Sequence, residues 1–339
     1  MAASPDWVLR ELRATRAKPP GHASIDADRR AIYDAALQQF EELLAAARAV
    51  GPASRPLPLF YALSQAGRAI VAACGDVPSI RAHGLSEYRY RESERAPAEL
   101  LHRRIKRVVS KDGRDAFGAV ARATGSGGLT GSVELGAVWA ATPDTHRLPE
   151  GTWLPSWRPA LDIFVEPAQA EDRDDIHVLL LSMGGNPHLT ADEVLTDASK
   201  RYPTLAPGTR MAVRPSKSLP PGEWIVDAWW TPNETPLDAV ARPVAMAANA
   251  HRVIPLLPDQ AEQLSPLMLW WALLFGLSIF ARYEPGLWGQ ALDVSRDLHA
   301  VPLEALLDKA LDLMPSLVYE PLLALETAKL AATRSPDPP

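Results

Sequence analysis

Cysteine is almost missing from this chain of 339 residues, since Cys74 is the only one. A single thiol excludes an intramolecular disulfide framework and any zinc site built from several cysteines. The 20 glycines and 32 prolines are too few for a disordered low-complexity chain. The length suits one large domain or two ordinary ones, and it is ample for a sizeable core. We therefore expect a folded protein that is not held together by disulfides.

Long hydrophobic runs are also lacking. The longest, residues 267–281, has 15 residues, whereas a bilayer-spanning helix needs about 20. Ser265 before the run is a suitable N-cap, and Pro266 suits the first helical position. The run predicts a buried core helix, with a membrane span as the alternative. The first dozen residues show no signal-peptide pattern, so we expect a cytoplasmic protein without a membrane partner.

Four segments have the apolar spacing of helices. Residues 28–50 and 57–74 lie near the start of the chain and 266–283 and 303–330 near its end. We expect the last to break at Pro315 and Pro321 because proline removes a helical hydrogen bond. The small residues Ala62, Ala66, Ala69 and Ala73 form a stripe that allows another helix to approach closely.

The middle of the chain predicts strands. We expect a hairpin from residues 104–109 and 116–123 around the turn Asp112-Gly113. Further segments are a short helix at 132–141, strands at 160–166, 176–182, 211–213 and 224–229, and a helix at 190–201 with a capping box from Thr190 and Glu193.

These elements predict an α+β fold. Helices of residues 1–102 and 256–332 would form one bundle, because neither helical pair can bury both of its faces alone. Residues 103–255 would be a β-rich insertion, and residues 333–339 a disordered tail.

Several sequence blocks together carry a family resemblance. They are FYALSQAGR at 60–68, AHGLS at 82–86, WWALL at 270–274, ARYEP at 281–285 and Trp288. With them the chain resembles the YaaC-like family of bacterial proteins, which implies a soluble bacterial protein and little about its chemistry.

The helical ends are also similar to HEPN-type domains, many of which are RNases or accessory parts of toxin and defence systems. The nuclease motif of those domains is Arg, four to six residues, then His. Here the first histidine after Arg282 is His299, and the first after Arg68 is His83. The departure speaks against nuclease chemistry of that type.

Arg68 is the most informative candidate for binding. With Tyr61, Ser64 and Gln65 it forms a polar strip on an otherwise apolar helix. A buried guanidinium needs a partner. One reading is an anion site, since arginine presents a planar fork of donors. The other is a structural salt bridge to a carboxylate such as Glu284 or Glu320.

Two more groups are candidates for the same cleft. Arg282, Tyr283 and Glu284 end the most apolar helix, where the helix dipole favours a cation, so a cap or an interhelical bridge is the alternative reading. His83 sits beside Gly84 in a predicted loop and suits a base, a ligand or a simple hydrogen-bond donor. We expect these residues to share one cleft with the Arg68 strip.

Residues 81–114 hold ten basic and five acidic residues although the whole chain has a net charge of −6. Tyrosines interleave with them, as a surface that stacks bases would require. This segment is a candidate nucleic-acid surface, and a solvated face is the alternative. Its basic residues singled out here are Arg89, Arg91, Arg103, Arg104, Lys106 and Arg107.

The histidines make no metal-binding pattern, and we expect neither a metal nor a cofactor. We expect a non-catalytic binding or assembly subunit of a bacterial defence or stress system. Its partner would be a protein, a second copy of the chain or a nucleic acid. The alternative is an enzyme acting on RNA or a nucleotide, with Arg68 and Arg282 binding phosphate and His83 as the acid or base. A small-molecule binder is a third possibility.

Overall fold

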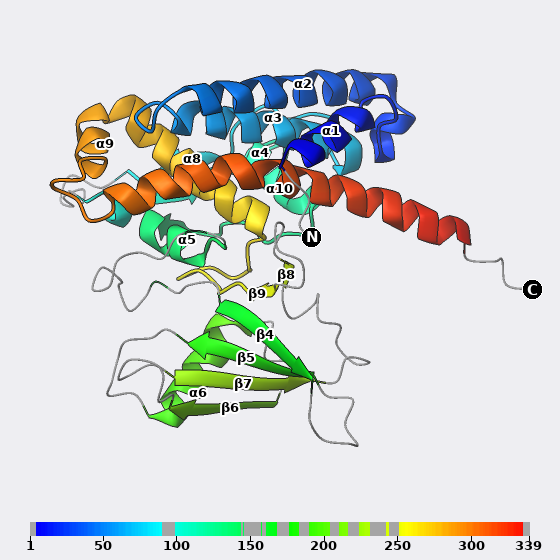
Figure 1. Ribbon diagram of the computed structural model, residues 1–339. Helices are drawn as coiled ribbons and strands as arrows, with labels where there is room; N and C mark the ends of the chain where they lie inside the picture. Colours follow the sequence, from blue (N-terminus) through cyan, green and yellow to red (C-terminus); the bar gives the residue numbers. More distant parts are fainter. Residues whose placement is uncertain are drawn as a thin grey trace, which may run out of the picture.

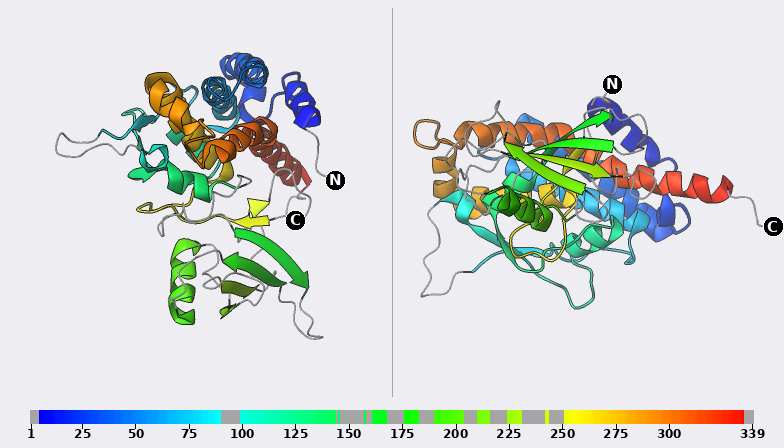
Figure 2. Two further views of the ribbon diagram at one scale, coloured as in Figure 1. Left: turned by 60° about the vertical axis from the view of Figure 1, so that its left-hand side comes forward. Right: turned by 90° about the horizontal axis from the view of Figure 1, so that it is seen from below.

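The computed structural model describes residues 5–89, 99–143, 145, 157, 161–167, 176–182, 190–203, 210–215, 224–230, 242–243 and 251–334. Helices from both ends of the sequence form one layered body, and an antiparallel sheet from the middle of the chain lies beside it (Figures 1 and 2). The predicted α+β class is confirmed.

The helices of this body come from distant parts of the chain. The N-terminal ones are α1 (Pro5–Thr15), α2 (Ala27–Ala49) and α3 (Pro56–Cys74), and the C-terminal ones are α8 (Pro266–Tyr283), α9 (Pro285–Ala291) and α10 (Ala300–Arg334). Short 3-10 turns lie at Gly21–Ser24 and Leu100–His102. The helices predicted at 28–50, 57–74 and 266–283 are confirmed to within two residues at each end, whereas α1 and α9 were not predicted.

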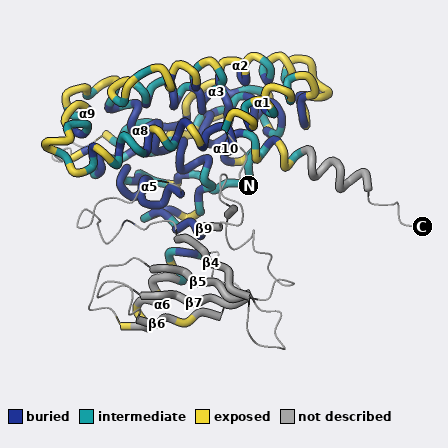
Figure 3. The backbone as a smooth tube through the Cα atoms, in the orientation of Figure 1, coloured by how far each residue is buried: buried dark blue, intermediate teal, exposed yellow. Residues whose placement is uncertain are grey.

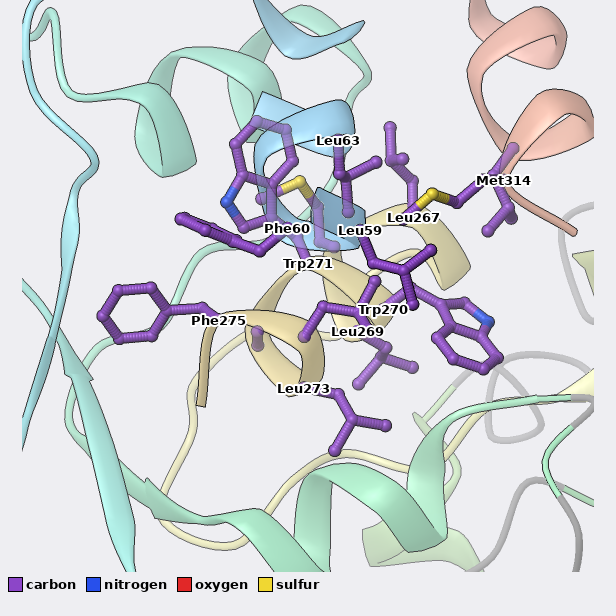
Figure 4. Packing of buried hydrophobic residues seen from close by; sticks show 14 of the residues in the cluster. Leu59, Phe60, Leu63, Leu267, Leu269, Trp270, Trp271, Leu273, Phe275 and Met314 are labelled. Atoms are coloured by element: carbon purple, nitrogen blue, oxygen red, sulfur yellow. The ribbon is translucent and has the colours of Figure 1, made fainter. Parts of the chain in front are cut away.

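Helix α3 lies in the middle of the body and is mostly buried (Figure 3). Leu59 and Leu63 of α3 pack with the two tryptophans of α8, Trp270 and Trp271, and with Met314 of α10 (Figure 4). Both tryptophans are buried, as expected for the core helix predicted there. Burying a large apolar side chain contributes about 1.5–3 kcal/mol, so this contact of three helices holds the two ends of the chain together.

The predicted hairpin at 104–109 and 116–123 is wrong. Only its first arm is a strand, β2 (Arg104–Arg107), which pairs with β1 (Leu85–Glu87) and β3 (Ser132–Glu134) in a three-stranded antiparallel sheet. Residues Ala116–Ala123 form helix α4. The buried carboxylate of Asp115 accepts a hydrogen bond from the backbone N–H of Gly118, which is an N-cap, and the alanines that follow favour helix.

The helix predicted at 132–141 is only partly right. Strand β3 takes its first three residues, and helix α5 (Leu135–Ala141) follows directly.

A second sheet has six strands in the order β6-β7-β5-β4-β9-β8, all antiparallel. The four predicted strands are confirmed, as β4 (Leu161–Pro167), β5 (Ile176–Ser182), β6 (Arg210–Pro215) and β7 (Trp224–Trp230). The strands β8 (Arg242–Pro243) and β9 (His251–Val253) were not predicted.

Helix α6 (Ala191–Arg201) begins at the predicted capping box. The Glu193 carboxylate accepts hydrogen bonds from the backbone N–H and the hydroxyl of Thr190, both at 2.8 Å. The Thr190 hydroxyl in turn accepts from the Glu193 backbone N–H, which is the reciprocal pattern of this motif.

The break predicted at Pro315 and Pro321 is absent. Helix α10 continues through both prolines. Each proline lacks one helical N–H, at a cost of about 3 kcal/mol. Buried side chains around them, among them Met314, Val318 and Leu322, offset that cost by packing into the core.

The proposed division into domains stays a prediction. Helices α4 and α5, which fall within the predicted insertion 103–255, pack against α3 and α8 of the helical body. Of the predicted tail, Thr333 and Arg334 end α10, and residues 335–339 lie outside the described residues.

Two helices, α3 and α8, are long and apolar enough to cross a membrane by length and composition, and most of each is buried in the fold. Core helices of soluble proteins pass the same test, so this is weak evidence and cytoplasmic localisation stays a prediction.

Candidate functional site

The polar strip of α3 faces the loop that follows the helix, since Arg68 donates a hydrogen bond to Ile80 in that loop. Tyr61, Gln65 and Arg68 lie four and three residues apart, and such positions share one helical face. All three are half-buried, whereas Ser64 beside them is buried. Of the four predicted strip residues, Tyr61 and Arg68 make the contacts that build the site.

Arg68 makes one hydrogen bond, from its Nη1 to the backbone carbonyl of Ile80, at 3.1 Å. The salt bridge to Glu284 that the sequence left open is absent, because Glu284 pairs with Arg103. In the part of the chain that the structure describes, no carboxylate lies within ion-pair distance of Arg68. The half-buried guanidinium therefore has no counter-charge from those residues.

The loop that carries His83 is fixed by the start of α4. The backbone carbonyls of Ala82 and His83 accept hydrogen bonds from the N–H groups of Ala116 and Phe117, at 2.7 and 3.2 Å. Gly84 follows with a φ of +82°, a conformation that glycine adopts without strain. A Cβ there would lie 2.6 Å from a carboxylate oxygen of Asp115. The position of His83 is thus set by backbone contacts.

The imidazole of His83 rests against α3. Its ring centroid lies 5.7 Å from that of Phe60 and 6.5 Å from that of Tyr61. Phe60 in turn meets Phe275 of α8 edge-on at 5.4 Å. The buried face of the histidine is therefore aromatic, while the residue itself reaches the surface.

Arg282, at the end of α8, approaches the same place. Its guanidinium donates hydrogen bonds to the hydroxyls of Tyr61 and Tyr283 and lies 4.6 Å from the centroid of the Tyr283 ring. Partial burial lowers the pKa of Arg282, but the hydrogen bonds to Tyr61 and Tyr283 outweigh it and the net shift is upward. Arg282 is therefore charged at any physiological pH.

Both guanidinium groups act on His83. Its pKa lies below the ordinary value, first because of partial desolvation and then because of the positive charges of Arg68 and Arg282. We call Arg68, His83 and Arg282, together with Tyr61 and Tyr283, the cationic cluster. Five of the eight residues predicted to line one cleft thus meet in the structure.

With this geometry in view, comparison with known protein families matches residues 3–322 to the family described as YaaC-like Protein. The chain belongs to the YaaC-like family. The comparisons with curated proteins and with solved structures gave no match. The similarity of the helical ends to HEPN-type domains is not shown by any of the three.

Glu284 was predicted for the same cleft but has another role in this YaaC-like protein. Its carboxylate and that of Glu87 both accept hydrogen bonds from the Nη2 of Arg103. Arg103 is only 9% exposed, and its guanidinium also lies 5.3 Å from the centroid of the Phe280 ring. This ion triad joins β1, the start of β2 and the end of α8 beside the cationic cluster.

The predicted nucleic-acid surface contains three arginines that already have partners within the chain. Arg103 belongs to the ion triad, Arg104 donates to the hydroxyl and the carbonyl of Ser132, and Arg107 pairs with the fully buried Asp115. The ammonium of Lys106 lies 5.9 Å from the centroid of the Tyr88 ring. Arg89 is exposed, and Arg91 lies outside the described residues. The surface stays a prediction.

Among the residues that the structure describes, no group of three or more His, Cys, Asp and Glu side chains is arranged to hold a metal ion. Guanidinium groups bind negative charge, so the cationic cluster offers anion binding, with an imidazole beside it.

Two contributors to the site were missed by sequence reasoning. Phe60 forms part of the wall behind His83, and its neighbour Tyr61 in the same helix was the only hint. Asp115 fixes the His83 loop through α4, and its signal was an N-cap aspartate before an alanine-rich run. The turn Asp112-Gly113 just before it favoured the hairpin reading instead.

Proposed function

We propose that this YaaC-like protein is a non-catalytic binding subunit and that its cationic cluster receives an acidic group of the partner. The observation that carries the proposal is the pair Arg68 and Arg282. Arg68 donates to the Ile80 carbonyl in the loop that leads to His83, and Arg282 donates to Tyr61 beside the His83 ring. Neither arginine has a carboxylate partner among the described residues.

Physical chemistry favours an anionic occupant at such a place. Two like charges near the ring of His83 repel each other. An anion between them would remove the repulsion and gain charge-assisted hydrogen bonds. The arrangement therefore supports recognition of negative charge.

The partner would be a protein or a nucleic acid, and a second copy of the chain is included. Assignment to a bacterial defence or stress system rests on the resemblance seen in the sequence alone. The exposed position of Arg282 and Tyr283 suits contact with a large partner, since neither is covered by the rest of the chain.

Capture from the host's own lysate tests the proposal. The tagged protein should retain a partner that Arg282→Glu loses, because the new carboxylate repels the acidic group. Arg13→Glu is the matched control, since Arg13 is an exposed arginine on α1 that pairs with Glu41. Analytical ultracentrifugation of each variant reports self-association. A strictly monomeric protein that retains no partner, or one whose capture is equally weakened by both changes, would contradict the proposal.

The second candidate is an enzyme that acts on RNA or a nucleotide. It is favoured by the lowered pKa of His83, which leaves a neutral imidazole at pH 7 next to two guanidinium groups. A neutral imidazole accepts a proton, and guanidinium groups stabilise charge on a phosphate. In that case His83→Asn should abolish turnover of an RNA or nucleotide substrate while the protein stays folded. Full turnover by that variant would exclude His83 as the acid or base.

A further inference from the structure

The cationic cluster has more hydrogen-bond donors than the protein uses. A guanidinium carries five N–H groups. Arg68 donates one of them to the Ile80 carbonyl, and Arg282 donates two to the hydroxyls of Tyr61 and Tyr283. The contacts given by the described residues leave the remaining donors to solvent or to a ligand. A ligand with several acceptor oxygens at one centre would use them best.

Aromatic rings lie directly beside these donors. Tyr283 is 62% exposed, and the half-buried ring of Tyr61 lies against His83, with the buried Phe60 behind it. Flat rings next to a cationic centre favour nucleotide binding, since a base stacks on the ring while its phosphate meets the charge. A ligand that combines an anion with a flat ring system fits the cationic cluster and its aromatic neighbours better than a bare anion does.

We propose that the cationic cluster binds a nucleoside monophosphate, with the phosphate monoester between Arg68 and Arg282 and the base against the neighbouring aromatic rings. The proposal rests on the proposed function, because it names the acidic group that the same site recognises. The nucleotide is either free or the 5′-terminal residue of a strand, and both sources present the same phosphate monoester.

Charge favours the monoester over a diester. A phosphate monoester carries about −1.5 to −2 near pH 7 and has three terminal oxygens. A phosphodiester carries one charge and has two such oxygens. The two guanidinium groups carry two positive charges, which the monoester balances and the diester does not. Selectivity for the monoester is therefore the signature that separates this site from a general basic surface.

Calorimetric titration of the full-length protein with three adenosine compounds tests the signature. Adenosine 5′-monophosphate, the cyclic 3′,5′-monophosphate and adenosine share one base and differ in their phosphate. We expect the monoester to bind at least about tenfold more tightly than the other two, because each charge-assisted hydrogen bond that is lost costs about a factor of ten. Equal binding of all three compounds, or no binding of the monoester, overturns the proposal.

Single substitutions assign the binding to the cluster. Arg282→Ala, at an exposed position, should weaken monoester binding by about tenfold or more without unfolding the protein. Arg68→Lys keeps the positive charge but loses the planar fork of guanidinium donors, so it should weaken monoester binding as well. Arg13→Ala on α1 is the control and should bind as the wild type does. An unchanged affinity of Arg282→Ala, or an equal loss in Arg13→Ala, overturns the assignment.

A pair of short oligonucleotides distinguishes the two sources. If a strand with a 5′-phosphate binds and the same strand with a 5′-hydroxyl does not, the site accepts a strand end. If only the free monophosphate binds, the ligand is a free nucleotide. Either result supports the proposal, whereas equal binding of both strands without selectivity for the monoester contradicts it.

The same variants keep this proposal apart from the proposed function. If Arg282→Ala loses the nucleotide but retains every partner from the lysate, the nucleotide site stands and the partner-binding role falls. If the partner is lost and no monophosphate binds even to the wild type, the partner-binding role stands and the nucleotide proposal falls.

Discussion

The hydroxyl of Tyr61 on α3 accepts a hydrogen bond from the guanidinium of Arg282 at the end of α8, across 221 positions of sequence. This bond joins the N-terminal and C-terminal parts of the helical body at its surface. Tyr61 also touches the ring of His83, so the same tyrosine connects the cation to the imidazole. A substitution of Arg282 should therefore change the pKa of His83.

Removal of the Arg282 charge should raise the pKa of His83. Arg282 is one of the two cations that hold this pKa below its ordinary value. We expect Arg282→Ala to move the His83 titration toward higher pH, measured by NMR on the imidazole protons. Arg13→Ala should leave it in place. A His83 pKa that does not move would show that Arg282 is too distant or too well screened to act.

Stability should fall on acidification through His83. Because its pKa in the folded protein lies below that in the unfolded chain, the unfolded chain binds more protons near pH 6. The contribution of His83 to stability is present above about pH 6.5, the unfolded pKa, and is lost as pH falls through the folded pKa. Urea unfolding at pH 7.5 and pH 5 should show a smaller loss for His83→Gln than for the wild type. Equal losses would assign the acid sensitivity elsewhere.

Arg103 should matter more for stability than its surface counterparts. Its removal leaves the carboxylates of Glu87 and Glu284 facing each other without their shared cation. We expect Arg103→Ala to lower the free energy of unfolding by about 3 kcal/mol, as for broken buried ion pairs. Arg122→Ala breaks a bridge to Asp76 at the surface and should cost at most about 1 kcal/mol. Urea unfolding of both variants makes the comparison, and equal costs would contradict it.

Two glycines should respond to alanine in opposite ways. A Cβ on Gly67 would lie 2.3 Å from the ring of Trp271, in the packed contact of α3 and α8. We expect Gly67→Ala to destabilise the protein by about 1–3 kcal/mol through overpacking. Gly289 in α9 has open space around it, so Gly289→Ala should be neutral or stabilise by up to about 1 kcal/mol. Thermal unfolding of both variants is the measurement, and a harmless Gly67→Ala would refute the close packing.

Cys74 should be a poor nucleophile in the folded protein. Burial raises the pKa of its thiol to about 11, and the Sγ donates to the carbonyl of Ile70. At pH 7.5 the thiolate is then about a hundredfold scarcer than for an ordinary thiol of pKa about 9. A chromogenic disulfide reagent should therefore label Cys74 slowly in buffer and rapidly in denaturant. Equally fast labelling under both conditions would contradict the burial.

The long helices α2, α3 and α8 and the strands β4 to β7 could be predicted from the sequence because their signals are local. Apolar spacing and a stop at Gly51-Pro52 place α2, and two short apolar runs on either side of the acidic turn 171–175 place β4 and β5. The segment 116–123 was misread because an Asp-Gly turn before β-branched and aromatic residues resembles a hairpin, whereas the cap at Asp115 decides for a helix. Likewise, the prolines of α10 predict a break that tertiary packing prevents.

For the site, sequence alone determined which side chains stand out, since an arginine in an apolar helix and a cation at the end of another are visible in the residue order. Only the tertiary structure decided which of them meet. It brought Tyr61, His83 and Arg282 together and turned Glu284 toward Arg103 instead. The physical reason is that a local pattern specifies the face of a helix, while the partner of that face depends on how α3 and α8 pack, which is a property of the whole core.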